Sequence, residues 1–293
     1  MHSSGMPSKA ADQTPEPRQS GSAAFTSPMG STLNSALTRC LLATLTMASC
    51  GALRAQTDEI QVYDAGIAPV GVFALTWHNN FTTSGARAPE NPGGVVPNHS
   101  LNGVTEWAYG ITHWFEAGLY LPLYTATSDG AVLVDGFKLR MLLVSPDAGQ
   151  RQFFYGVNFE FSFNTRHWDP HRYTSEIRPI IGWHLGRLDL IFNPILDNSY
   201  NGFPGLDFAP ATRIAFNFSK TWALAAEEYD DFGPLRHFYA SAQQSHQLFA
   251  VLDYRSASSL TLEAGVGFGL AGATDHRVLK LILTRDLNAP RTP

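Results

Sequence analysis

FFYGVNFEFSFN, residues 153–164, is the stretch that decides the fold. Side chains of a β-strand alternate between two faces, so the odd-numbered apolar residues share one face. The small or polar even-numbered residues, apart from Phe154, share the other. In a soluble sandwich the apolar face would pack in the core, and in a membrane barrel it would contact lipid. The rest of the sequence has to distinguish these two structures.

The composition favours a surface that is not mainly charged. The 293 residues are 44% hydrophobic and 12% aromatic, but only 15% are charged, against about 25% in an average soluble domain. Mean hydropathy is −0.10, and the apolar run near 41–52 is too short for a helix across the ~30 Å bilayer core. A membrane protein of this composition is therefore a barrel. The net charge of −5 and the lack of a basic stripe predict no nucleic-acid partner.

The first 55 residues are predicted to be a leader. Residues 1–28 are rich in Ser, Pro, Gly and Ala, which predicts disorder. Arg39 then precedes a short apolar core and small residues, a pattern typical of a cleavable signal peptide, with the cut between Ala55 and Gln56. A translation start at Met29 would explain the long stretch before that core.

Both cysteines, Cys40 and Cys50, lie within this leader. The exported chain would then hold neither a disulfide nor a cysteine nucleophile. An alternative interpretation makes Cys50 the lipidated residue of a lipoprotein signal, although Met47 is atypical for such a motif.

The alternation of residues 153–164 recurs in eleven further stretches, which predicts an all-β chain of about 12 strands. The least regular are the stretch with Pro179, which cannot donate to a ladder, and the stretch in which Glu227 and Glu228 are adjacent. The twelve stretches are 71–82, 105–111, 115–121, 133–143, 153–164, 176–183, 188–197, 208–218, 222–229, 248–254, 260–270 and 279–284.

The connections between these stretches alternate between short turns and longer loops. Short turns on one rim and long loops on the other, with an even strand count, indicate a single antiparallel up-and-down transmembrane β-barrel. A soluble sandwich would need protective charges on its edge strands, and the apolar faces carry almost no Lys. We expect a leader over 1–55, a periplasmic N-terminal segment over 56–70, the barrel over 71–287 and a tail over 288–293.

Several short motifs carry a resemblance to a known group of proteins. They are EIQVY at 59–63, NGVTEW at 102–107, GLYLP at 118–122, KLR at 138–140, EIRPIIGW at 176–183 and FNPILD at 192–197. With them the chain resembles uncharacterised proteobacterial outer-membrane proteins labelled as transporters, which are similar to the barrel family named after the phenol-degradation MetA pathway. The resemblance covers about residues 57–287 and implies a 12-stranded barrel that passes small molecules. Such barrels commonly end in an aromatic residue, and this chain ends in Pro293.

If the apolar faces contact lipid, the opposite faces line the lumen. Lys138 and Arg140 would then neighbour Glu116 and Glu160, with Arg178 also beside Glu160, so that opposite charges meet across strands. The predicted lumen-lining residues are Glu106, Glu116, Lys138, Arg140, Asn158, Glu160, Glu176, Arg178, Asn193, Asp197, Arg213, Asn217, Asp253, Glu263 and Lys280.

No pattern predicts catalytic residues, a metal site or a cofactor. The chain has no Gly-x-Ser-x-Gly elbow, and Ser241 or Ser245 near His246 is more typical of loop composition than of a dyad. His167 and His171 form no complete metal-ligand set. A barrel of this size lies between filled 8-stranded barrels and open 16-stranded porins, so both a filled lumen and a solute pathway stay open.

The sequence therefore predicts an integral outer-membrane barrel of a Gram-negative cell, exported by its signal peptide and inserted by the barrel-assembly machinery. We expect it to work as a narrow pore or transporter for small solutes, including hydrophobic ones. Its partners would be outer-membrane lipid and that solute. Two alternatives remain: a structural or interaction barrel with a plugged lumen, and a lipid-modifying outer-membrane enzyme.

Overall fold

The structure is a computed structural model, and it describes residues 59–256 and 259–288. The leader, its predicted cleavage site, Met29 and Cys50 lie outside these residues, as does the tail after Asn288. No helix among the described residues is long and apolar enough to cross a membrane. The strands are β1 (Phe73–Ser84), β2 (Leu101–Thr112), β3 (Phe115–Ala126), β4 (Val132–Val144), β5 (Phe153–Asn164), β6 (Tyr173–Leu185), β7 (Leu188–Asn193), β8 (Leu196–Asn198), β9 (Leu206–Phe208), β10 (Ala211–Asn217), β11 (Trp222–Asp231), β12 (Ser245–Arg255), β13 (Leu260–Gly269) and β14 (Arg277–Asp286).

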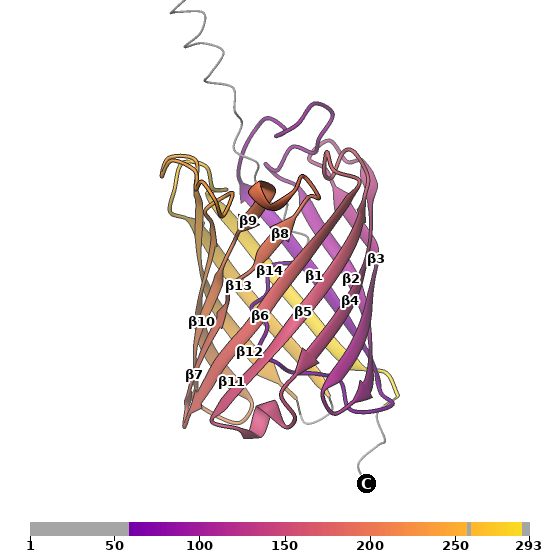
Figure 1. The fold of residues 1–293 in the computed structure, drawn as a ribbon, viewed down its shortest axis with the longest axis vertical. Coiled ribbons are helices and arrows are strands. Elements are labelled where there is room, and N and C mark those ends of the chain that lie inside the picture. The colour runs from indigo at the N-terminus through magenta and orange to yellow at the C-terminus, as the bar shows by residue number, and fades with distance from the viewer. Residues whose placement is uncertain (1–58, 257–258, 289–293) are drawn as a thin grey trace, which may run out of the picture. The chain divides into compact units, whose positions relative to one another are not determined.

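The strands form one closed antiparallel barrel (Figure 1). Consecutive strands pair along the wall, except that β7 and β8 both pair with β6 and that β10 pairs with β7. β1 closes the sheet against β14, for example through Trp77 opposite Leu283. Two barrel strands are each broken in the middle. Pro194 lies between β7 and β8, and Pro210 lies between β9 and β10, whereas Pro179 lies within the continuous strand β6. Counting each broken strand once gives the twelve predicted strands.

The two rims differ as the sequence predicts. One rim, hereafter the short-turn rim, lies at the bottom of Figure 1. It carries tight connections such as Gly186-Arg187, and β1 begins and β14 ends there. Gly186 has a φ of 69°, a left-handed conformation that glycine adopts without steric cost. The opposite rim, hereafter the loop rim, carries the long connections 85–100 and 232–244.

The alternation places apolar side chains on the outside of the barrel. On β5, Tyr155 and Phe161 are 55% and 46% exposed, whereas Asn158 and Glu160 on the inward face are at most 1% exposed. Leu139 on the neighbouring β4 is 52% exposed. Aromatic pairs from adjacent strands lie at the short-turn end of the wall, as in the girdles of membrane barrels: Phe73–Tyr109, Phe153–Trp183 and Trp222–Tyr254, with ring centroids 4.5, 5.5 and 4.8 Å apart.

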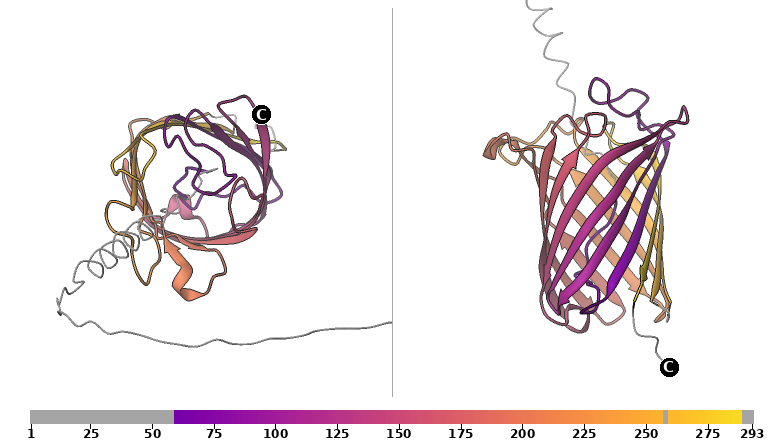
Figure 2. Two further views of the ribbon diagram at one scale, coloured as in Figure 1. Left: turned by 90° about the horizontal axis from the view of Figure 1, so that it is seen from above. Right: turned by 90° about the vertical axis from the view of Figure 1, so that its right-hand side faces the viewer.

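Residues 59–68, hereafter the luminal segment, run inside the barrel before β1 begins. Seen from above in Figure 2, this indigo part of the chain lies within the ring of strands. We expected 56–70 on the periplasmic side. The structure instead places 59–68 in the lumen, and Val70, which is 48% exposed, pairs with Gly110 near the short-turn rim. Ile60 and Val62 are at most 4% exposed, and burying such a side chain contributes about 1.5–3 kcal/mol.

Inward-facing apolar side chains of the wall receive this segment. Val62 and Tyr63 pack in a cluster with Phe154 and Ile180. Ile60 packs in a second cluster, which includes Phe249 and Val251. The lumen is therefore not a uniformly polar channel, because apolar side chains of the wall pack against the luminal segment.

Candidate functional site

All fifteen predicted lumen-lining side chains lie on the inward face of the barrel. Ten of them are at most 6% exposed: Glu106, Glu116, Arg140, Asn158, Glu160, Arg178, Asn193, Arg213, Asp253 and Lys280. The other five make luminal contacts or line luminal cavities: Lys138, Glu176, Asp197, Asn217 and Glu263. A solute pathway along these side chains remains a prediction.

Arg140 on β4 is the centre of the first luminal charge cluster. Its guanidinium contacts Glu116 on the adjacent β3 and lies 2.6 Å from Glu106 Oε1 on β2. Glu106 also lies 3.2 Å from His78 Nε2, and Glu116 accepts a 2.5 Å hydrogen bond from Ala68 N of the luminal segment. The cluster therefore joins neighbouring strands to the segment inside them.

Tyr63 anchors the luminal segment in the middle of the barrel. Its backbone N donates to Asn193 Oδ1 over 2.7 Å, and Asn193 Nδ2 donates back to its carbonyl oxygen over 3.1 Å. Its hydroxyl lies 2.7 Å from that of Tyr120. The Arg178 and Arg140 guanidinium groups lie 4.6 and 5.6 Å from its ring centroid, within the range of cation–π attraction.

Two predicted pairs on this side are present and one is not. Lys138 Nζ lies 3.5 Å from Glu160 Oε2, and Arg140 contacts Glu116. We expected Arg178 beside Glu160, but its Nε and Nη2 bind Glu176 instead, at 2.6 and 2.9 Å. The register explains this difference, because Glu160 stands opposite Glu176 and Arg178 stands opposite Asn158.

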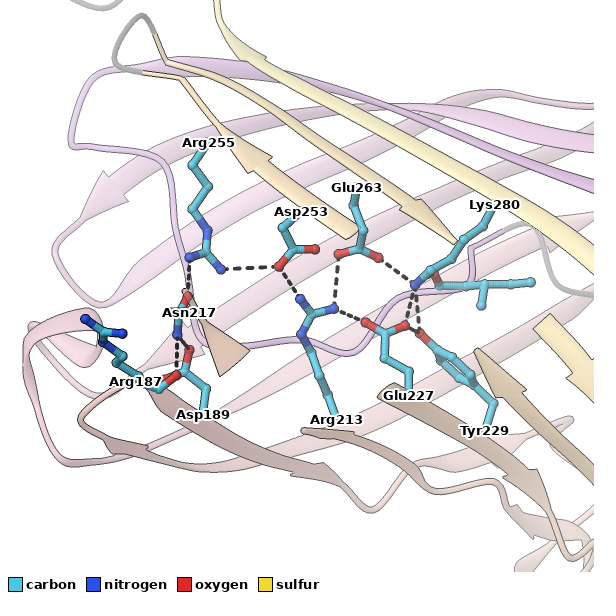
Figure 3. A network of polar contacts seen from close by, with 11 residues as sticks. Arg187, Asp189, Arg213, Asn217, Glu227, Tyr229, Asp253, Arg255, Glu263 and Lys280 are labelled. Carbon is cyan, nitrogen blue, oxygen red and sulfur yellow. Dashed lines mark hydrogen bonds and ion pairs between the residues drawn. The ribbon is translucent and has the colours of Figure 1, made fainter. Parts of the chain in front are cut away.

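A second charge cluster lies on the opposite part of the wall (Figure 3). Arg213 contacts Glu227 and Asp253 and lies 3.4 Å from Glu263 Oε2. Lys280 contacts Glu227 and lies 2.5 Å from Glu263 Oε1. Two cations thus share three carboxylates on neighbouring strands, an arrangement in which each buried charge has an opposite partner.

Glu227 and Tyr63 are important luminal residues that the sequence analysis did not select. The adjacent Glu227 and Glu228 required one of them to face inward, and that signal was sufficient to find Glu227. Tyr63 gave no comparable signal, because it precedes the barrel.

Lys280 also donates to Ile60 O over 3.3 Å, so the second cluster contacts the luminal segment as well.

Two cavities lie at the two ends of the lumen. The loop-side vestibule, of about 310 Å³, extends from Glu160 and Arg178 up to the loops at Trp168 and Asp275. The other cavity, of about 520 Å³, lies at the short-turn rim and includes Arg187 among its lining residues. Between them runs the luminal segment.

The rim histidines pair with neighbouring carboxylates. His167 Nε2 lies 2.6 Å from Asp135 Oδ1, and His246 Nδ1 lies 2.6 Å from Asp230 Oδ1. Ser245 Oγ donates to a threonine hydroxyl over 3.3 Å rather than to His246. Within residues 59–256 and 259–288, no group of three or more His, Cys, Asp or Glu side chains is placed to hold a metal ion.

Comparison with known proteins identifies the type of fold. No protein-family model matches the chain, and no curated protein matches it significantly. The crystal structure of the COG4313 outer membrane channel from Pseudomonas putida F1 is 13% identical, with a TM-score of 0.52 over 78% of this chain and 100% of that one. The KdgM porin is 8% identical, with a TM-score of 0.48 over 73% of this chain and 99% of that one. The resemblance to the MetA-pathway family remains a prediction. The chain therefore has the fold of an outer-membrane β-barrel.

Proposed function

We propose that this chain is an integral outer-membrane protein that works as a narrow channel or transporter for small solutes. The observation that carries the proposal is the contrast between the two faces of the barrel. The outer face is apolar, as at Tyr155 and Leu139, and the inner face carries buried polar and charged side chains, as at Asn158 and Glu160. A cavity lies at each end of the lumen. A barrel built only as a membrane anchor needs no cavities in its lumen.

The luminal segment makes this channel a narrow one. It crosses the space between the two cavities and is held by Asn193, Arg178 and Lys280 through main-chain hydrogen bonds. We propose that solute passes beside this segment or after it shifts. The cavities at its two ends, of about 310 and 520 Å³, suit small solutes better than large ones.

Conductance in planar bilayers tests the proposal directly. We expect small single-channel currents from the purified barrel and uptake of small solutes into liposomes that contain it. A correctly folded barrel, shown by different gel migration of boiled and unboiled samples, that neither conducts nor admits solute would refute a channel.

The alternative favoured by a specific observation is a structural or interaction barrel with a plugged lumen. Tyr63 and Ile60 are nearly fully buried against the wall, which is what a permanent plug requires. The same experiment separates the two functions, because a permanent plug predicts no current even in variants that loosen the segment. We expect no enzymatic activity.

A further inference from the structure

The loop-side vestibule has a strong excess of negative charge. Ten of its lining residues are Asp or Glu, and only Lys138 and Arg178 carry a permanent positive charge. Both of these cations are already engaged, Lys138 with Glu160 and Arg178 with Glu176. In the two charge clusters deeper in the barrel every carboxylate contacts Arg140, Arg213 or Lys280, whereas the vestibule also holds carboxylates that contact neither of its cations.

Part of this negative charge stands in one row across three strands. Glu176 on β6 is directly opposite Asp197 on β8, and Asp197 is directly opposite Asp207 on β9. Like charges that face each other across a sheet are destabilising. Among the residues that the structure describes, neither the Asp197 nor the Asp207 carboxylate makes a hydrogen bond or ion pair. The row is therefore an arrangement whose repulsion a bound cation would relieve.

Glu59, from a different part of the chain, independently points to a cationic ligand. It lines the same vestibule, its residue is only 9% exposed, and neither of its carboxylate oxygens has a hydrogen-bond partner. A buried carboxylate without a partner costs free energy that a donor entering the cavity would offset. The luminal segment thus carries an unsatisfied acceptor into a cavity that is already acidic.

We propose that the loop-side vestibule binds a small organic cation through a primary ammonium group. An ammonium offers three N–H donors to several carboxylates at once, and Glu59 with Asp197 provides acceptors from two different elements. Trp168 and Ile195 line the same cavity and provide contact for an apolar body. A volume of about 310 Å³ is at the small end of ligand cavities. A metal ion is disfavoured, since no described group of three ligands is placed to hold one.

This inference names the class of solute for the proposed channel, and binding can be tested without transport. The test is isothermal titration calorimetry on the full exported barrel in nonionic micelles at low salt. The probes are 2-phenylethylammonium chloride, the neutral 2-phenylethanol, the anionic 3-phenylpropanoate and CaCl₂, each corrected with empty micelles. We expect saturable binding of the ammonium alone, weakening as ionic strength rises.

Two variants locate the site. Glu59→Gln removes a charge outside the strands and should weaken ammonium binding roughly tenfold or more, since hydrogen bonds to charged groups are the strong ones. Asp197→Asn tests the carboxylate row in the same way. Glu228→Gln is the matched control, because Glu228 is exposed on the outer face of β11, and its affinity should equal that of the parent. Gel migration of unboiled samples confirms that each variant is folded.

The outcomes separate the binding site from the channel. Equal binding of the alcohol and the ammonium, binding of Ca²⁺ in place of the amine, or unchanged affinity in both folded vestibule variants would overturn the proposed site. Ammonium binding without conductance would support the site and count against the channel. Conductance without ammonium binding would support the channel and remove this solute class.

Discussion

Replacing Tyr63 with alanine should open the lumen. The substitution removes the hydroxyl contact with Tyr120 at 2.7 Å and the ring beneath the Arg178 and Arg140 guanidinium groups. It leaves the two main-chain hydrogen bonds with Asn193 in place. The change therefore weakens the contacts that hold the luminal segment against the wall, without altering any residue of the wall.

The structure allows the size of this effect to be worked out. One net hydrogen bond contributes about 1 kcal/mol, and cation–π contacts at a desolvated site contribute about 1–2 kcal/mol. Large-to-small substitutions of buried aromatic residues cost about 3–5 kcal/mol. Because water can fill the space that the ring leaves in the lumen, we expect a cost at the lower end of this range. A loss of about 3 kcal/mol shifts the equilibrium between closed and open arrangements by roughly a hundredfold.

Single-channel recording in planar bilayers measures this shift. We expect the Tyr63→Ala variant to spend far more time than the parent at a higher conductance level. Tyr63→Phe keeps the ring and loses only the hydroxyl, so its shift should be roughly fivefold. If Tyr63→Ala folds normally and its currents match those of the parent, the luminal segment is not held by this side chain and the reasoning fails.

Two further predictions concern the wall. Leu139→Arg places a charge on the outward face near the middle of β4. It should lower the free energy of unfolding by about 2–4 kcal/mol in a bilayer, against about 0.5 kcal/mol or less at an exposed site of a soluble protein. An unchanged midpoint of urea unfolding in lipid vesicles would contradict a lipid-facing surface. Glu227→Gln leaves Lys280 with one fewer partner in a buried cluster and should cost about 3–5 kcal/mol in the same assay, whereas Glu228→Gln should be nearly neutral.

The barrel itself was predictable because the wall repeats one simple rule. Residues 153–164 alternate between lipid-compatible and small or polar side chains, and β5 has those same bounds. The period-two rule depends on local geometry that every strand shares. It does not report where a strand is interrupted, so the breaks at Pro194 and Pro210 within two predicted strands appear only in the structure.

The luminal segment was not predictable from the same rule, although one signal for it was present. Phe154 is apolar in the inward phase of its strand, and it is fully buried. Leu142 and Ile180 on the neighbouring strands share this property. Apolar side chains that point into a polar lumen need an apolar partner, and together they indicate that a further piece of chain packs there. The identity of that piece depends on contacts between distant residues, which no local pattern contains.

The structure also divides the luminal charges into two sets with different consequences. Arg140, Arg213 and Lys280 are each bound by two or more carboxylates, so every carboxylate of these clusters contacts a cation that partly cancels its field. Such clusters stabilise the wall and the segment within it. Asp197 and Glu59 face a cavity whose two cations, Lys138 and Arg178, are bound to other carboxylates, so the field of Asp197 and Glu59 remains available to an incoming ion. Selectivity should therefore change with substitutions in the vestibule, and stability with substitutions in the clusters.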